Sequence, residues 1–331
     1  MKVAILGSNS FSGSHLVNSL SAYPNCKVLG ISRSPEYPAF FLPYLYRKKV
    51  GPIRFEFFQL NINTQLPEII RLFDEERPEV IVNFAAQGNV EHSWDNPIHW
   101  LTTNAIGVAN LAFALCGRDY LKKYIQISTP EIYGLCRNFK ENLNYYNPST
   151  PYAVSKVAGD LFLSALHKKF KFPVCFAMST NFYGPHQQLY RIIPRTIICL
   201  KKGVKIPLHG GGRVQRDFIS IFDFVDGVVK VISNGKIGNT YHFSSGVLMK
   251  IKDLVKFICD KMNYDFEKSV EISNERGDQD SAFELNSSKA RKKLGWEPVI
   301  DLSGGIDGVI AWVENNWNEI LKQPLEYIHK E

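Results

Sequence analysis

Short apolar runs alternate with longer amphipathic stretches through the first half of the chain. Runs with the length and composition of buried strands occupy residues 2–6, 27–31, 55–60, 80–85, 124–128 and 174–178. Between them, helical spacing of apolar positions covers residues 12–22, 65–76, 97–117 and 152–170. This order of strands and helices predicts an α/β protein built on a parallel, doubly wound sheet.

The alternation becomes irregular after about residue 180. Turns rich in glycine and proline occur there, for example YGP at residues 183–185 and GGG at residues 210–212. We find no internal repeat and no low-complexity linker. The second half is therefore predicted to be a smaller lobe with a different architecture.

A glycine-containing turn, GSNSFSG at residues 7–13, joins the first predicted strand to the first helix. Glycine lets the backbone approach a pyrophosphate closely, and the N-terminus of the following helix offers N–H groups to an anion. The turn predicts a dinucleotide-binding Rossmann domain at residues 1–180. Residues 181–331 would then form a smaller C-terminal α/β lobe that mainly binds substrate.

The second predicted strand ends in GISRS at residues 30–34. An NAD enzyme usually carries an acidic residue here, which binds the ribose 2′-hydroxyl. This chain has Ser32 and Arg33 instead, and an arginine at this place can bind the 2′-phosphate of NADP. We therefore favour NADP, with NAD held by other contacts as the alternative.

Tyr152 and Lys156 open the helix predicted at residues 152–170, directly after Pro151. Residues four apart share one face of a helix, and an ammonium beside a phenol favours the phenolate and lowers its pKa. Tyr152 would then take a proton from a hydroxyl while a hydride leaves the same carbon. The same spacing also occurs in ordinary amphipathic helices, but its position downstream of a dinucleotide turn favours catalysis.

The fifth predicted strand ends in ISTPEIYG at residues 127–134. Polar side chains at the carboxyl ends of parallel strands face the ligand crevice. We expect Thr129 to hydrogen-bond the hydroxyl that Tyr152 deprotonates, and Glu131 to remove a proton alpha to the ketone so formed. The alternative for Glu131 is a surface carboxylate at the start of a loop.

With these features the chain resembles the extended short-chain dehydrogenase/reductase family, and within it the nucleotide-sugar 4,6-dehydratases, especially the dTDP-glucose type. Gly7 and Gly13 match the first and third glycines of the family's G-x-x-G-x-x-G, with Ser10 in place of the second. Four further stretches resemble family motifs, namely NFYGP at 181–185, RIIPR at 191–195, RDFI at 216–219 and residues 276–298. Arg33 is closer to the NADP-using GDP-mannose dehydratases.

The residue motifs and the resemblance together assign the candidate sites. The catalytic residues are Tyr152, Lys156, Thr129 and Glu131. The dinucleotide site comprises Gly7, Asn9, Ser10, Phe11, Gly13, Ser32, Arg33, Asn61, Ile62, Ala85, Ala86, Asn104, Tyr152 and Lys156. The site for a nucleotide-diphosphate sugar comprises Gln87, Asn181, Arg191, Arg216 and Arg276. The resemblance also implies a homodimer that pairs through the helices at 97–117 and 152–170.

The family mechanism implies transient oxidation of the sugar at C4, removal of the C5 proton by Glu131, and loss of water from C6. In the dTDP-glucose enzymes an aspartic acid follows the catalytic threonine and protonates the departing hydroxyl, whereas this chain has Pro130. Either Glu131 or a water supplies the proton, or water is not lost. In the second case the chain would be a nucleotide-sugar epimerase with a 4-keto intermediate, or a 4-dehydrogenase or decarboxylase.

Composition and charge argue against metal-binding, disulfide-bonded, membrane-spanning and nucleic-acid-binding proteins. The six cysteines are scattered without a C-x-x-C pair, which predicts neither a metal site nor a disulfide framework and favours the reducing cytoplasm. No apolar run reaches the roughly 18–20 residues that a membrane helix needs, and the first residues do not resemble a signal peptide. The net charge of +7 comes from dispersed basic pairs. It therefore favours ordinary surface charge or attraction of an anionic ligand over nucleic-acid binding.

Overall fold

The computed structural model of the protein describes residues 1–50, 54–141, 145–274 and 282–330. It confirms the doubly wound parallel sheet. Among the described residues, seven parallel strands pair in the order β11-β7-β5-β4-β1-β2-β3. These strands are β1 (Lys2–Leu6), β2 (Lys27–Ser32), β3 (Phe55–Gln59), β4 (Val80–Asn83), β5 (Lys123–Ser128), β7 (Val174–Ser179) and β11 (Thr240–Phe243). All except the edge strand β3 are buried along nearly their whole length, as expected for a sheet covered on both faces.

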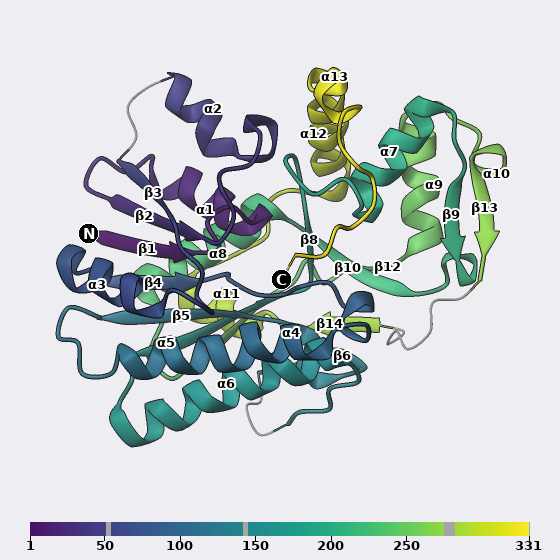
Figure 1. The fold of residues 1–331 in the computed structure, drawn as a ribbon. Coiled ribbons are helices and arrows are strands. Elements are labelled where there is room, and N and C mark those ends of the chain that lie inside the picture. The colour runs from purple at the N-terminus through teal and green to yellow at the C-terminus, as the bar shows by residue number, and fades with distance from the viewer. Residues whose placement is uncertain (51–53, 142–144, 275–281, 331) are drawn as a thin grey trace.

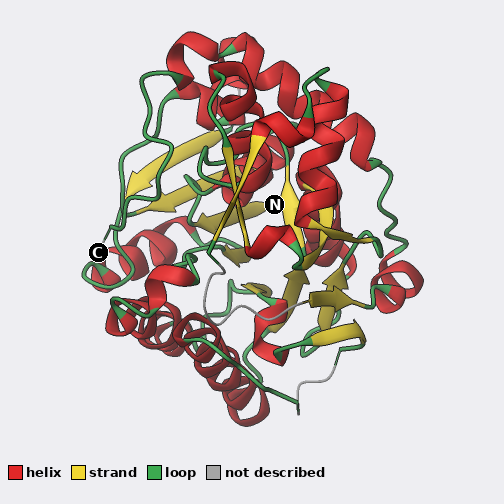
Figure 2. Ribbon diagram, turned by 90° about the vertical axis from the view of Figure 1, so that its right-hand side faces the viewer, coloured by secondary structure: helices red, strands yellow, loops and turns green. Residues whose placement is uncertain are grey.

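Helices cover both faces of this sheet (Figure 1). Alternate residues of β1 separate the two cores, because Val3 and Ile5 point to one face and Ala4 and Leu6 to the other. Helices α1 (Phe11–Leu20) and α8 (Ile221–Asn234) pack on the first face, with α2 (Pro43–Val50) beside α1. The second face carries α3 (Leu66–Glu76), α5 (Val108–Ala114) and α6 (Pro151–Phe170). Figure 2 shows the strands lying between helices on two sides.

The helix predicted at residues 97–117 is not one regular α-helix. It consists of α4 (Pro97–Leu101), a π-helical stretch η3 (Thr102–Gly107) and α5, and ends at Ala114. A π-helical turn widens the helix locally and is frequent at functional sites. Here it contains Asn104, whose backbone lies directly against Gly159 of α6.

The second lobe is built around a smaller sheet in the order β12-β10-β14-β6, with β8 also paired to β10. Its strands are β6 (Cys136–Phe139), β8 (Asn181–Tyr183), β10 (Gln215–Ser220), β12 (Leu248–Lys250) and β14 (Ala282–Leu285), and a separate pair is formed by β9 (Ile206–His209) and β13 (Val270–Ser273). The helices of this lobe are α7 (Ile192–Lys202), α9 (Ile251–Lys261), α10 (Phe266–Ser269), α12 (Leu302–Asn315) and α13 (Trp317–Ile320). Helix α11 (Ser288–Leu294) packs instead against α8 and β11 of the first sheet. Short 3₁₀ turns occur at η1 (Ala39–Phe41), η2 (Glu91–Ser93), η4 (Pro130–Tyr133) and η5 (Gly210–Gly212).

The chain passes between the two lobes more than once. Strand β6 precedes residue 180 yet lies in the smaller sheet, while α8 and β11 follow it and belong to the first. The division into residues 1–180 and 181–331 therefore stays a prediction about where each lobe mainly begins. Within the described residues, no helix is both long and apolar enough to cross a membrane.

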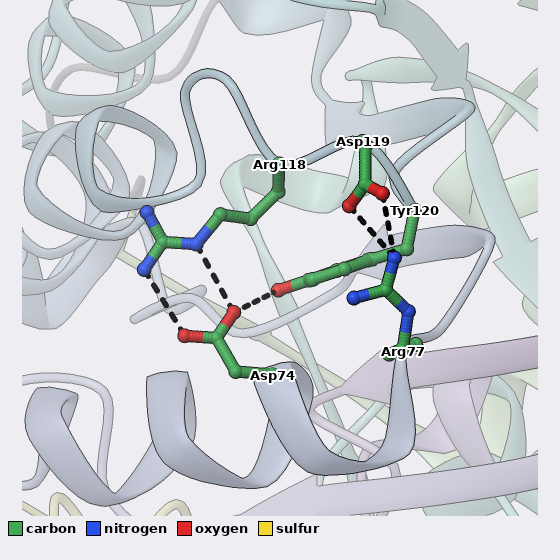
Figure 3. Close-up of polar contacts among 5 residues, drawn as sticks. All are labelled: Asp74, Arg77, Arg118, Asp119 and Tyr120. Carbon is green, nitrogen blue, oxygen red and sulfur yellow. Dashed lines mark hydrogen bonds and ion pairs between the residues drawn. The ribbon is translucent and has the colours of Figure 1, made fainter.

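A polar network fixes the connection between α5 and β5 against the end of α3 (Figure 3). Asp74 accepts hydrogen bonds from Arg118 at 3.0 and 3.1 Å and from the Tyr120 hydroxyl at 2.8 Å. Arg77 donates to both carboxylate oxygens of Asp119, at 2.8 and 2.7 Å. These contacts lie at the edge of the sheet opposite the carboxyl ends of its strands, and so do not belong to the ligand crevice.

Candidate active site

The glycine turn after β1 is held tightly to the ends of β2 and β4. Gly7 has a φ of +76°, and a Cβ there would lie 2.8 Å from the backbone nitrogen of Ala85. Ser10 is the N-cap of α1, because its Oγ accepts a hydrogen bond from the Gly13 N–H at 3.0 Å. The serine in place of the family's second glycine therefore has a clear structural role.

Asn9 and Ser32 connect the turn to the end of β2. The Asn9 backbone N–H donates to Ser32 Oγ at 3.0 Å, and its Nδ2 donates to the carbonyl oxygens of Ser34 and Pro35 at 3.0 and 2.8 Å. Phe11 begins α1 directly after the turn. The sequence-predicted residues around the turn are thus brought together at the carboxyl edge of the sheet, where open α/β sheets bind their ligands.

Asn61 and Asn104 make hydrogen bonds within the protein. Asn61 Oδ1 accepts from the Asn63 N–H at 2.9 Å and shapes the turn before α3, next to Ile62. Asn104 Oδ1 accepts from the Gln87 N–H at 2.8 Å, and its Nδ2 donates to Ser155 Oγ at 2.9 Å. Asn104 therefore ties the segment after Ala85 and Ala86 to α6. A direct role of either asparagine in cofactor binding stays a prediction.

The catalytic candidates converge where β5 ends and α6 begins. Thr150 caps α6 by accepting from the Ala153 N–H at 3.1 Å, and the helix places Tyr152 in its first turn. The Thr129 side chain lies close enough to the Tyr152 phenol to lower its pKa, and the charges of Glu131 and Arg191 both act on the same phenol. The structure thus brings together three catalytic candidates and one substrate candidate from three separate stretches of the sequence.

Lys156 lies one turn further along α6 and is only 4% exposed. Its Nζ donates to the backbone carbonyl of Ile127 on β5 at 2.8 Å. Burial lowers the pKa of Lys156, and the negative charge of Asp160 opposes that effect. Lys156 is therefore anchored to the end of β5, and its action on the Tyr152 phenol stays a prediction.

The predicted lowering of the Tyr152 pKa is not found. Burial raises this pKa, the charge of Glu131 raises it further, and Thr129 and Arg191 lower it. The net direction is upward because removal from water penalises the phenolate more than the nearby donors favour it. The predicted lowering of the Tyr152 pKa was therefore wrong for the protein without a bound ligand.

Asp160, which the sequence analysis did not single out, completes the inner face of α6. It is fully buried, and its Oδ2 accepts a hydrogen bond from Ser128 at the end of β5. Burial raises the pKa of Asp160 to about 6, while Lys156 and Ser128 act in the opposite direction. The regular spacing of residues 152, 156 and 160 along one helix face was the available signal.

The substrate candidates are less closely gathered. Gln87 is buried in the segment that follows β4, and Arg191 lies at the start of α7. Asn181 on β8 pairs with Phe218 on β10, two residues after Arg216, whose guanidinium lies 4.9 Å from the ring centre of Phe283. Arg276 lies outside the described residues. Among those residues no cluster of metal-ligand side chains was found.

Comparison with known proteins identifies the family. A model of the NAD dependent epimerase/dehydratase family matches residues 3–243. The chain is 30% identical to a dTDP-D-glucose 4,6-dehydratase of Homo sapiens, covering 97% of this chain and 93% of that protein. It is 28% identical to a dTDP-glucose 4,6-dehydratase of Xanthomonas campestris pv. campestris, covering 75% and 76% of the two chains.

Solved structures with the same fold include a dTDP-glucose 4,6-dehydratase from Bacillus anthracis in complex with NAD, with a TM-score of 0.85 at 25% identity, covering 97% of this chain and all of that one. A UDP-glucuronic acid 4-epimerase from Bacillus cereus shares the fold with a TM-score of 0.85 at 24% identity, covering 95% and 99% of the two chains. The resemblance to dTDP-glucose 4,6-dehydratases inferred from the motifs is thus confirmed. This chain belongs to the NAD dependent epimerase/dehydratase family.

Proposed function

We propose that the protein is a nucleotide-sugar 4,6-dehydratase that uses a nicotinamide dinucleotide and yields a 4-keto-6-deoxy sugar nucleotide. The main support for this proposal is that Tyr152, Thr129 and Glu131 lie close together where β5 ends and α6 begins. Similarity to named dTDP-glucose 4,6-dehydratases over nearly the whole chain supports it.

The side chains suit the successive proton transfers. Tyr152 accepts the proton of the 4-hydroxyl, which Thr129 holds in place, and Lys156 supplies positive charge beside the phenol. A dinucleotide held at the glycine turn would supply the acceptor for the C4 hydride and the donor for C6. Glu131 removes the C5 proton, which the C4 ketone acidifies. Because Pro130 carries no proton, the departing hydroxyl takes its proton from Glu131 or from a water.

For the cofactor, a nicotinamide dinucleotide follows from the family, and NADP is our preferred form. The end of β2 offers Ser32 and Arg33, and the Ser32 hydroxyl is already engaged by the Asn9 N–H. The similar solved dehydratase from Bacillus anthracis contains NAD, which keeps NAD as the alternative. Arg33→Ala should weaken NADPH binding, measured by fluorescence titration, while leaving NADH binding nearly unchanged. Equal effects on both would refute the assignment.

We further propose a cytoplasmic homodimer. Apolar side chains remain exposed on the helices that the resemblance assigns to the dimer, namely Ile98, Ile106, Phe113, Val154 and Leu161. Burial of such a face against a second copy would remove it from water. Light scattering should give twice the chain mass. The five fully buried free cysteines and the half-buried Cys116 suit a reducing compartment.

The second candidate is an epimerase with a 4-keto intermediate, which Pro130 favours. Mass spectrometry separates the two. The protein would be incubated in heavy water with NADP or NAD and dTDP-, UDP-, GDP- or CDP-linked sugars. Loss of one water with deuterium uptake would establish the dehydratase. Deuterium uptake without loss of water would establish the epimerase and refute our proposal.

A further inference from the structure

The C-terminal segment, residues 322–330, contains no helix or strand and contacts residues that follow β2 and β4 at the carboxyl edge of the first sheet. In Figure 1 it descends from α13 past α7 and ends beside that edge. Its side chains alternate: Leu325, Tyr327 and His329 are partly buried, whereas the residues between them are exposed. Period-two burial is the pattern of an extended segment docked by one face.

Two aromatic side chains anchor the segment. Tyr327 stacks on His92, with ring centres 4.9 Å apart, and meets Tyr190 edge-on at 5.4 Å. His329 stacks on the buried Trp100 at 5.1 Å and at an angle of 9°. Stacked and edge-on ring pairs of this kind contribute beyond the area that they bury.

Polar contacts extend the anchoring to both lobes. The Nε2 of His329 and the Nδ1 of His99 are hydrogen-bonded at 2.9 Å, and Arg195 of α7 pairs with Glu326 at 3.0 Å. The backbone carbonyl of Lys330 accepts a hydrogen bond from Gln87 Nε2 at 2.6 Å. One segment thus links α7 to α4 and to the end of β4.

The end of the segment reaches the loop that follows β2. The Lys330 ammonium lies 4.9 Å from the ring centre of Tyr37, and the charges of Arg33 and Arg191 both act on the Tyr327 hydroxyl. Arg33 follows β2, which we expect to lie beside the adenosine of a bound dinucleotide. Gln87 follows β4, which we expect to lie beside the middle of that dinucleotide. The segment therefore lies between the loop that follows β2 and the residues that follow β4, which border the predicted dinucleotide path on two sides.

We propose that residues 322–330 form a strap that closes over the bound dinucleotide and slows its release, with Tyr327 and His329 as its anchors. The inference rests on the proposed function insofar as a dinucleotide binds at the glycine turn. A strap held by several modest contacts opens locally without unfolding the protein. Each opening gives the ligand its exit, as with other closing segments over binding sites.

Release of NADPH, followed by stopped-flow fluorescence after mixing the loaded protein with excess NADP, tests the strap. We compare the full chain, a chain ending at Leu321, and a double variant Tyr327→Ala/His329→Ala. Ile328→Ala is the matched control because Ile328 is 60% exposed on the opposite side of the same segment. Thermal unfolding without ligand verifies that each protein is folded, and hydrogen exchange reports protection of residues 322–330.

We expect the two altered straps to release NADPH at least about tenfold faster, and Ile328→Ala to match the full chain. We also expect NADPH to increase hydrogen-exchange protection of the segment in the full chain. Unchanged release in both altered proteins would overturn the inference, as would tighter binding, which would show that the segment blocks the site. If the full chain turns over nucleotide sugars but the altered chains release NADPH at the same rate as the full chain, only the strap inference fails. If it binds neither NADPH nor NADH, the proposed function fails as well.

Discussion

Asp160 is fully buried on α6. Burial of its negative charge lowers the stability of the folded protein, and a neutral side chain would avoid this loss. The Oδ2 atom of Asp160 accepts a hydrogen bond from Ser128, while its Oδ1 has no hydrogen-bond partner among the described residues. Burial raises the pKa of this carboxyl from 3.8 to about 6. Asparagine keeps the shape of the side chain and an acceptor for Ser128, but it cannot ionise. We therefore expect Asp160→Asn to stabilise the protein wherever Asp160 would be charged.

The size of the effect follows from the pKa. One unit corresponds to about 1.36 kcal/mol, so the rise from 3.8 to about 6 corresponds to about 3 kcal/mol. The folded protein holds this proton more tightly than the unfolded chain. Its contribution to stability is therefore complete below pH 3.8 and is lost as the pH rises through about 6. Asp160→Asn should exceed the wild type in unfolding free energy by about 3 kcal/mol at pH 8, and by progressively less toward pH 4.

Urea unfolding of both proteins over this pH range measures the difference. Asp74→Asn is a control of opposite sign, because the hydrogen bond from Arg118 lowers the pKa of Asp74. That variant should lose stability at pH 8 relative to the wild type. If Asp160→Asn is no more stable than the wild type at pH 8, the electrostatic reasoning is wrong. Turnover should nevertheless fall, because the Asp160 charge opposes deprotonation of Lys156.

Three further substitutions test the site. Tyr152→Phe should abolish turnover in the nucleotide-sugar assay yet keep NADPH binding within about twofold, since only the proton acceptor is lost; retained turnover would exclude Tyr152 as the base. Glu131→Gln should stop deuterium uptake at C5 while some oxidation at C4 continues, and a fully active variant would show that another group is the C5 base. Gly7→Ala adds a side chain at a φ of +76° and 2.8 Å from the Ala85 nitrogen, so we expect a loss of about 1–2 kcal/mol or more in urea unfolding and weaker NADPH binding. Unchanged values for both would show that the turn tolerates a Cβ.

The strands of the first sheet were predictable because they are buried and their apolar runs are local. The predicted strand at 2–6 coincides with β1, and the one at 27–31 falls one residue short of β2. The strand predicted at 80–85 instead ends at Asn83, whose side chain accepts the hydrogen bond of the Ala85 N–H. Such a local competition between side chain and strand pairing is not visible in a hydrophobic pattern.

Longer-range features escaped prediction for a different reason. Strand β11 is four residues long and pairs with β7 across an intervening stretch that includes α7 and α8. Nothing in its own sequence distinguishes this partner from others, so the seventh strand could not be placed. The π-helical stretch around Asn104 was also missed, because apolar spacing in residues 97–117 fits a regular helix almost as well.

The positions of candidate residues in the site could be predicted from motifs, whereas the pKa values of their side chains could not. Thr129 and Glu131 were placed by their position after a strand, but the upward pKa of Tyr152 depends on burial by elements distant in sequence. The C-terminal segment was missed because it has no regular pattern long enough to predict docking. Its partners, such as Trp100 and Gln87, become neighbours only in the folded chain.

Pro130 cannot donate a proton, but it stabilises the backbone of the turn between Thr129 and Glu131. It is buried at the first position of η4, where the missing N–H of proline is no loss, and Thr129 caps the same turn by accepting from the Glu131 N–H at 3.3 Å. Proline thus fixes the backbone between the two catalytic candidates. Because it offers no proton, we expect the departing hydroxyl to take its proton from Glu131 or from a water. Loss of the Glu131 carboxyl should suppress C5 exchange and, with it, release of water, because water leaves C6 only after the C5 proton has been removed.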